Sequence, residues 1–339
     1  MQILLDWLKG KRAASITAPA MAPDAALNSA TRVSVEELIK LQCHAGKISL
    51  TPSQPARTRL AGNHGSRFHG RGMDYQESRI YQPGDDLRSI DWRVTARTGK
   101  PHTKLYEEER ERPVILFLDL NPGMFFGTRG SLKSVAAARA AAIIAWAGAA
   151  HGDRIGALLF NGGHYELPPR GGRHGVLRLI RELAERADPR AALNIASSPG
   201  SLNAALARLR RVSRPGSLIF LLSDFYGIDD ESGRHLLRLR HQSDLAAIQV
   251  VDPLELEPPP AARYGVTDGQ RLGVLDTRDG KVRQAYQEYF SRHHQAVAET
   301  MRSRAIPHLR LSTADDVAST LARHFAPVGQ APAIRKAAA

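Results

Sequence analysis

The chain has 339 residues, and at roughly 150 residues per domain this length predicts about two domains. Its 42% hydrophobic and 24% charged residues are ordinary for a globular protein and exclude disorder of the whole chain. The formal charge of +13 would suit nucleic acid, an anionic membrane or an acidic protein partner. A coding bias toward arginine and alanine would produce the same excess of positive charge.

A single cysteine, Cys43, excludes an intrachain disulfide and a cysteine-rich zinc site, and it favours a reducing, cytoplasmic setting. The apolar run within residues 1–15 is too short for an export signal, and the charges follow that run instead of preceding it. The longest apolar stretch, residues 140–150, falls well below the about 18 residues of a membrane span. We therefore expect neither an export signal nor a membrane span.

Residues 1–33 are expected to form a flexible leader, because residues 13–31 are rich in Ala, Pro, Ser and Thr and lack apolar periodicity. A short helix is expected from Ser34 through Leu41, with Thr31 or Ser34 as its cap. From 47 to 112 the sequence shows short β-type runs separated by glycines and prolines. The prediction for residues 34–112 is therefore a short helix plus a β-rich domain.

From residue 113 onward, apolar runs of strand length alternate with stretches of helix length. Strands are expected at 114–118, 155–160, 218–222, 245–251 and 307–311, and helices at 132–150, 175–187, 201–211, 232–241, 282–303 and 315–325. Continuous apolar runs are typical of parallel strands that helices cover on both faces. Residues 113–326 are therefore predicted to form a doubly wound, mostly parallel α/β domain, followed by a flexible tail at 327–339. Thr313 and Asp316 have capping-box spacing for the last helix.

Polar residues follow three of these predicted segment boundaries. Asp119 ends the first strand and is followed by Asn121, Ser201 begins a helix, and Asp224 ends a later strand. These positions fall on one edge of a parallel sheet, where oxygen ligands could hold Mg²⁺ or Mn²⁺. The alternative is that the two aspartates only accept hydrogen bonds from amides at helix starts.

This arrangement resembles a von Willebrand factor A-like domain. The metal site of such domains has an Asp-x-Ser-x-Ser sequence after the first strand, a Thr at a later helix start and an Asp after a central strand. By position, Asp119 and Asp224 match the two Asp residues and Ser201 falls near the Thr. Asn121 and Gly123 replace the two serines, and Gly123 has no side-chain ligand. The resemblance therefore implies a degenerate site in which metal is weakly held or absent.

A second pattern lies ahead of the α/β domain. It consists of Arg79, Tyr81, Pro83, Gly84, Asp85, Asp86, Arg88, Asp91, Trp92 and Arg97. With the acidic run at 107–109, this pattern is similar to domain-of-unknown-function family 58, over roughly residues 34–325. The resemblance implies a β-rich region fused to an A-like domain, in a short form without transmembrane helices. It also implies a MoxR-type AAA ATPase as the partner.

Pro83 and Gly84 suit the two central positions of a type II turn. The three aspartates of the pattern lie among arginines, so bidentate Arg–carboxylate pairs are available. We interpret the pattern as a network that pins the two domains together. The alternatives are a docking surface and an acidic catalytic site.

The favoured hypothesis is a non-enzymatic interaction or adaptor protein that works with a MoxR-type ATPase in the assembly, maturation or chaperoning of other proteins. One alternative is a Mg²⁺-dependent hydrolase or phosphotransferase at the same edge. Another is nucleic-acid binding through the basic α/β domain. Residues 57–112 contain 12 basic and 9 acidic residues, whereas residues 129–241 contain 17 and 9, so the positive excess lies in the α/β domain. A basic α/β surface favours an acidic protein partner or client over nucleic acid.

Overall fold

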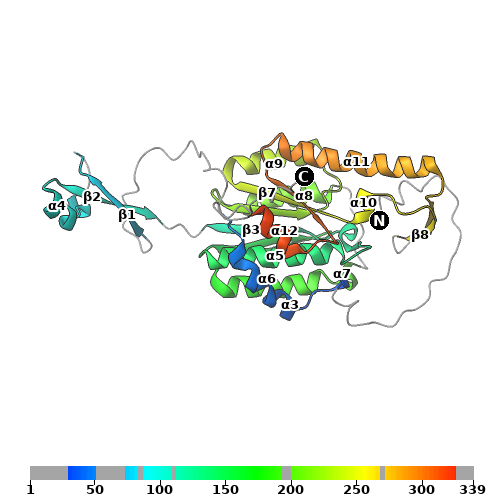
Figure 1. Ribbon diagram of the computed structural model, residues 1–339, viewed down its shortest axis with the longest axis horizontal. Coiled ribbons are helices and arrows are strands. Elements are labelled where there is room, and N and C mark those ends of the chain that lie inside the picture. The colour runs from blue at the N-terminus through cyan, green and yellow to red at the C-terminus, as the bar shows by residue number, and fades with distance from the viewer. Residues whose placement is uncertain are drawn as a thin grey trace, which may run out of the picture. The chain divides into compact units, whose positions relative to one another are not determined.

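The computed structural model describes residues 30–50, 73–82, 87–108, 112–192, 200–267 and 272–325 (Figure 1). The described residues fall into two units. Residues 73–108 belong to the smaller unit, and the described residues before and after them belong to the larger one.

A six-stranded sheet forms the centre of the larger unit. Its strands are β3 (Pro113–Asp119), β4 (Arg154–Phe160), β5 (His164–Gly171), β6 (Leu218–Ser223), β7 (Asp244–Val251) and β10 (His308–Ser312). They lie in the order β10-β7-β6-β3-β4-β5, and every neighbouring pair is parallel except the antiparallel pair of β4 and β5. The predicted α/β class with a mostly parallel sheet is confirmed.

Helices cover both faces of this sheet (Figure 1). One face packs against α5 (Lys133–Ala150), α6 (Gly172–Arg186) and α12 (Val317–His324), and the other against α8 (Ser201–Val212), α9 (Asp230–Gln242) and α11 (Gly280–Arg302). Alternate residues of each strand point to opposite faces, so Leu116 contributes to the first core and Phe117 to the second. The shorter elements are η3 (Pro122–Phe125), α7 (Pro189–Ala192), α10 (Pro253–Leu256), β8 (Arg263–Thr267) and β9 (Leu272–Asp276).

The five predicted strands and six predicted helices of this region are all present, with ends that differ by a few residues. The antiparallel edge strand β5, the β8–β9 pair and α10 were not predicted. Strand β5 contains Pro168, Pro169 and Gly171, which read as a loop in the sequence. Prolines are tolerated on an edge strand, because one side of such a strand needs no ladder hydrogen bonds.

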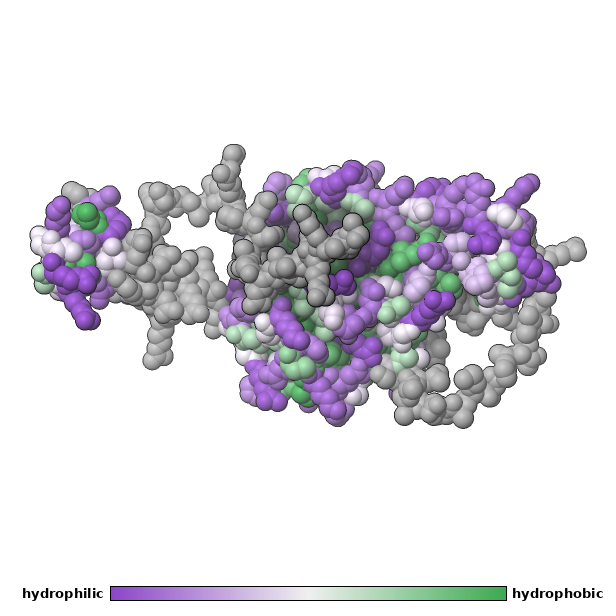
Figure 2. All heavy atoms as spheres, in the orientation of Figure 1, coloured by the Kyte–Doolittle hydropathy of each residue, from purple (hydrophilic) through white to green (hydrophobic). Residues whose placement is uncertain are grey.

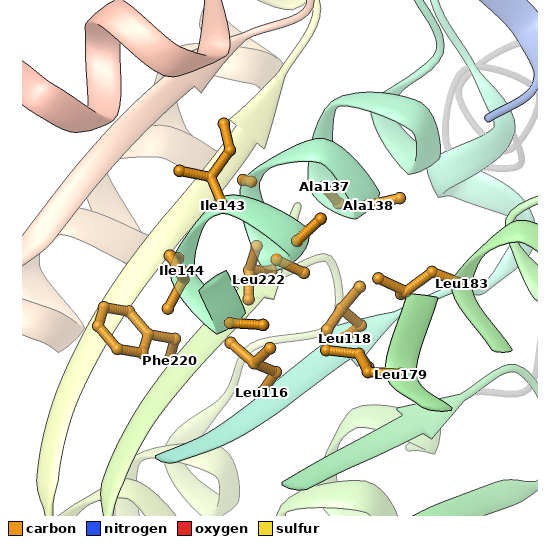
Figure 3. Packing of buried hydrophobic residues seen from close by; sticks show 14 of the residues in the cluster. Leu116, Leu118, Ala137, Ala138, Ile143, Ile144, Leu179, Leu183, Phe220 and Leu222 are labelled. Atoms are coloured by element: carbon orange, nitrogen blue, oxygen red, sulfur yellow. The ribbon is translucent and has the colours of Figure 1, made fainter. Parts of the chain in front are cut away.

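Helix α5 is the most deeply buried helix of this unit. Its residues from Lys133 to Gly148 are buried apart from Arg139, so it shows almost no amphipathic stripe. Figure 3 shows Ile144 of this helix beside Phe220 and near Leu116 of the sheet. Small residues allow close approach on several sides at once, and a Cβ at Gly148 would lie 2.9 Å from Ile155 Cδ1. Part of the alanine content of the chain therefore serves packing.

The N-terminal helix α3 (Val35–Lys40) and the following 3-10 helix η1 (Leu41–Lys47) cover the outer side of α5. Leu38 is fully buried there, its carbonyl accepts a hydrogen bond of 3.1 Å from Trp146 Nε1, and Glu37 pairs with Arg139. The Ser34 side chain caps α3, as predicted. Helix α3 thus packs with the α/β unit, whereas the sequence analysis grouped it with the β-rich segment.

The predicted capping box of the last helix is wrong. Asp316 is the cap of α12 and accepts a hydrogen bond from the Ser319 amide. The Thr313 hydroxyl instead donates to the buried Asp252 carboxylate at 2.8 Å. Asp252 also accepts hydrogen bonds from Thr128 and from the Leu254 amide. Thr313 therefore bonds to this buried cluster and does not cap α12.

The described part of the smaller unit contains one antiparallel strand pair and a helix. Its elements are β1 (Met73–Ile80), η2 (Leu87–Ser89), α4 (Trp92–Thr98) and β2 (His102–Glu108). Buried Asp91 caps α4 through the amides of Arg93 and Val94, and it accepts a 2.9 Å hydrogen bond from Ser78 of β1. That carboxylate therefore ties the helix to the strand pair.

Among the described residues, no helix combines the length and hydropathy that crossing a membrane requires.

We predict that Leu38→Ala lowers the free energy of unfolding by about 2–5 kcal/mol, because it leaves a cavity between α3 and α5. Gln42→Ala, an exposed change in η1, is the matched control and should stay within about 0.5 kcal/mol of the wild type. Chemical denaturation of the full chain measures both. Equal effects of the two variants would contradict the packing of residues 35–47 against α5.

Candidate functional site

The order in which the chain adds strands to the sheet reverses between β3 and β6, which are neighbours in space but not in sequence. The chain continues from β3 toward β4 and β5 on one side, and from β6 toward β7 and β10 on the other. Ligands of open α/β sheets bind at such a switch point, beyond the carboxyl ends of the strands. Asp119 ends β3 and Asp224 follows β6, so both predicted aspartates lie at this point.

Asp119 is buried and accepts hydrogen bonds on both carboxylate oxygens. Oδ1 accepts from the Asn121 amide at 2.9 Å and from Asn121 Nδ2 at 2.7 Å. Oδ2 accepts from the Ser223 hydroxyl at 2.7 Å, which links the ends of β3 and β6. The short turn after β3 and its neighbouring strand therefore hold this carboxylate in place.

Asp224 is paired with a buried lysine. Lys133 Nζ lies 2.9 Å from Asp224 Oδ2 and 2.8 Å from Glu255 Oε1, and the Lys133 residue is 1% exposed. Asp224 Oδ1 accepts a hydrogen bond of 3.1 Å from the Tyr226 amide. The ammonium thus joins the first residue of α5, the end of β6 and α10.

The other predicted positions lie in the same place. Asn121 Nδ2 is 3.3 Å from Ser201 Oγ at the start of α8, and both residues are partly exposed. A Cβ at Gly123 would lie 3.1 Å from Asp224 Oδ2. The structure therefore brings Asp119, Asn121, Ser201 and Asp224 together at one sheet edge. Asn121 Oδ1 is buried and has no hydrogen-bond partner within the described chain.

Two aromatic residues also border the cluster. The His293 ring stacks on Tyr226, with centroids 3.9 Å apart, and His293 Nε2 donates a 2.9 Å hydrogen bond to the Asp224 carbonyl. Lys133 Nζ lies 5.4 Å from the Tyr226 ring centroid, within the range of a cation–π contact. Burial lowers the pKa of His293 and raises that of Tyr226.

The pKa values of the two aspartates are shifted in opposite directions. Burial, together with the Asp224 charge, raises the pKa of Asp119 to about 7. Burial acts in the same direction on Asp224, but the charge and hydrogen bond of Lys133, together with the Tyr226 amide and His293, outweigh it and lower the pKa of Asp224. Burial would lower the pKa of Lys133, and the carboxylates of Asp224 and Glu255 outweigh it and raise that pKa. The Lys133–Asp224 pair is therefore charged, and Asp119 takes up a proton more readily than an ordinary aspartate.

These residues do not fit a divalent cation in the arrangement they adopt. All four carboxylate oxygens of Asp119 and Asp224 accept hydrogen bonds from groups of the chain itself. Asn121 turns a donor, its Nδ2, toward Asp119 and Ser201, and Gly123 offers no ligand. Within the described residues, no group of three or more His, Cys, Asp or Glu side chains is placed to hold a metal ion.

Four residues of the cluster were not predicted from the sequence: Lys133, Glu255, Tyr226 and His293. Lys133 carried a local signal, because a lysine at the first position of a helix opposes the helix dipole and so needs compensation. Glu255 carried one too, since Asp252 and Glu255 have capping-box spacing and form that box in α10. Tyr226 and His293 had no such signal, because their contact joins residues 67 positions apart.

The residues of the second pattern lie in the smaller unit. Arg79 Nη1 donates to the Ile80 carbonyl at 3.4 Å, and the Tyr81 amide donates to the Pro101 carbonyl at 2.8 Å. Asp91 caps α4, Trp92 is 71% exposed and Arg97 is exposed. Pro83, Gly84, Asp85, Asp86 and the side chain of Arg88 lie outside the described residues. The predicted type II turn and interdomain network remain predictions.

The fold and this cluster define an α/β protein with an open, mostly parallel sheet and a polar site at its switch point. The model of a family described as "Protein of unknown function DUF58" matches residues 77–296. Uncharacterized proteins from Mycobacterium bovis and Mycobacterium tuberculosis are each 33% identical to the chain over 292 residues, which is 85% of this chain and 89% of theirs. The chain therefore belongs to the DUF58 family.

Among solved structures, the chain is similar to the conserved hypothetical protein BatB from Bacteroides thetaiotaomicron, with a TM-score of 0.41 and 14% identity over 63% of this chain and 96% of that one. An aerotolerance-related membrane protein from Bacteroides fragilis gives a TM-score of 0.37 and 12% identity over 62% of this chain and 94% of that one.

We predict that the carboxylate of Asp119 makes the protein less stable as the pH rises. A buried carboxyl group with a raised pKa binds its proton more tightly in the folded than in the unfolded chain. Its stabilising contribution is complete below the unfolded value of 3.8 and is lost as the pH rises through about 7. Each pKa unit corresponds to about 1.4 kcal/mol, so the loss amounts to a few kcal/mol.

Asp119→Asn mimics the protonated acid and should remove this part of the pH dependence, whereas the exposed change Asp230→Asn should not. Urea denaturation at several pH values between about 4 and 8 measures the difference from the wild type. Parallel stability curves for wild type and Asp119→Asn would refute the raised pKa.

Proposed function

We propose that this protein is a non-enzymatic interaction protein that docks a protein partner at the carboxyl ends of β3 and β6. We call this place, where Asp119, Asn121, Ser201 and Asp224 meet, the switch-point edge. The observation that carries the proposal is that the buried charges of Asp119 and Asp224 are satisfied internally, while Asn121 and Ser201 remain partly exposed at the rim. The Asn121 carbonyl oxygen lacks a donor within the described chain. That oxygen is buried, so a partner would meet the exposed parts of Asn121 and Ser201, and a donor of the partner could satisfy the oxygen once the Asn121 side chain rotates outward. Docking of this kind requires no chemical step at the edge.

We further propose that the α/β unit is von Willebrand factor A-like. The strand order, the antiparallel strand β5 and the convergence of Asp119, Asn121, Ser201 and Asp224 at the switch point support this assignment. In this version of the fold the edge binds without a tightly held divalent cation.

The proposed partner is a MoxR-type AAA ATPase, and the proposed role is that of an adaptor in the assembly, maturation or chaperoning of other proteins. The ATPase comes from the family resemblance and not from the chemistry of the site. We place this role in the cytoplasm, where an exposed free thiol such as Cys43 stays reduced.

An acidic client would not suit the switch-point edge. Asp224 and Glu255 outnumber the single ammonium of Lys133, so the cluster has no positive charge to offer. Exposed arginines lie elsewhere on the unit, at the end of α8 and along α9. They include Arg211, Arg214, Arg234 and Arg238. We propose these helices as the surface that meets an acidic client.

A Mg²⁺-dependent hydrolase or phosphotransferase would need its cation beside Asp224. The Lys133 ammonium holds that carboxylate, so we do not propose this activity.

We predict that the tagged full-length chain binds a purified MoxR-type ATPase from the same organism. Asn121→Ala and Ser201→Ala should each weaken binding by about tenfold, which corresponds to about 1.4 kcal/mol. Asn121→Ala removes one side-chain hydrogen bond to Asp119, but the backbone amide still donates to that carboxylate, and neither variant removes a buried charge, so both should fold. Gln284→Ala, an exposed polar change on α11, is the matched control and should bind like the wild type. Biolayer interferometry gives the dissociation constants.

If the wild type does not bind the ATPase, the proposed partner is wrong. If the wild type binds and both rim variants bind equally well, the partner docks elsewhere and the switch-point edge is not the site.

A further inference from the structure

The first residue of α5 places a full positive charge inside the protein. Lys133 is 1% exposed, and its Nζ touches two carboxylates from segments far away in sequence, Asp224 after β6 and Glu255 in α10. Both partners of this salt bridge are buried as well, since Asp224 and Glu255 are 4% and 6% exposed.

This position is an unfavourable one for a lysine. The N-terminus of a helix carries a partial positive charge, which repels a cation and attracts anions. Removing an ammonium from water is also costly unless its partners compensate fully. Two carboxylates and the Tyr226 ring surround Lys133 and supply that compensation.

The same point of the sheet is where oxygen ligands from several segments could gather around a divalent cation. Asp224 reaches the ammonium through Oδ2, while Oδ1 is taken by the Tyr226 amide. A cation that used Asp224 would have to displace Lys133 from it and leave the buried ammonium with one carboxylate, Glu255, in place of two.

We propose that the Lys133 ammonium takes the place of a metal ion between Asp224 and Glu255, and that it keeps divalent cations away from these carboxylates. We call these three residues the switch-point cluster. The switch-point edge then binds its protein partner without a metal ion. This consequence for partner binding rests on the proposed function. Removal of the ammonium leaves Asp224 and Glu255, the two buried carboxylates that Lys133 Nζ joins, without a cation between them. Carboxylate oxygens are ligands that a hard divalent cation can use. The chain thus contains a latent metal site that Lys133 closes.

The test uses the full chain alone, without any partner, so that its outcome does not depend on the proposed function. Mn²⁺ is titrated into the wild type and into Lys133→Met, and bound Mn²⁺ is followed by electron paramagnetic resonance. The melting temperature of each protein is measured with EDTA and with Mn²⁺. Lys281→Met makes the same change at an exposed position and serves as the matched control.

The wild type and Lys281→Met should bind no stoichiometric Mn²⁺, and their melting temperatures should be the same with EDTA and with Mn²⁺. Lys133→Met should melt at a lower temperature in EDTA, bind one Mn²⁺ and recover part of the loss when Mn²⁺ is present. Where Lys133→Met alone does not fold, the double variant Lys133→Met with Glu255→Gln removes one of the unpaired charges. It should fold and bind Mn²⁺ through Asp224, more weakly than Lys133→Met does because one carboxylate is lost.

Stoichiometric Mn²⁺ binding by the wild type, lost in Asp224→Asn, would overturn the proposal. Failure of both Lys133 variants to bind Mn²⁺ would overturn the latent site. Neither result would bear on whether the edge docks a protein, which the ATPase binding experiment decides.

Discussion

The contact on which this structure depends most is the buried ion cluster of Lys133, Asp224 and Glu255. It fastens the start of the central helix to the end of a central strand and to α10. Removing one partner of a buried ion pair costs about 3–5 kcal/mol, because the remaining charge is left without compensation. The cluster also sets the charge of the switch point, since the ammonium helps to lower the pKa of Asp224, while burial and the Asp224 charge raise the pKa of Asp119.

Helix α5 can occupy this position because its sequence suits burial on all sides. Alanine and glycine let the sheet, α6 and the N-terminal segment 35–47 approach it together. Trp146 and Arg139 reach outward to Leu38 and Glu37 and fix that segment in place. The alanine-rich composition, which a coding bias would also produce, is at this helix a requirement of packing.

The sequence predicted the elements that have a periodic or continuous apolar pattern, such as the helix at 132–150 and the strand at 245–251. It also predicted that Asp119, Asn121, Ser201 and Asp224 share one edge, because the ends of parallel strands meet there. It did not predict β5, whose prolines are compatible with a strand only at a sheet edge. It did not predict the partner of Asp224 either. A contact between residues 91 positions apart depends on packing, and a buried lysine looks like a surface residue in sequence.

The charge state of Lys133 is the most direct test of this account. Its ¹⁵Nζ signal, assigned by its absence in Lys133→Arg, can be followed by NMR as the pH is raised through the range in which exposed lysines deprotonate. The account predicts that the Lys133 signal remains that of an ammonium above the usual pH range of lysine deprotonation, because two buried carboxylates outweigh the effect of burial and raise its pKa. Deprotonation of Lys133 before the exposed lysines would contradict the account, since a neutral amine could not be the cation of the switch point.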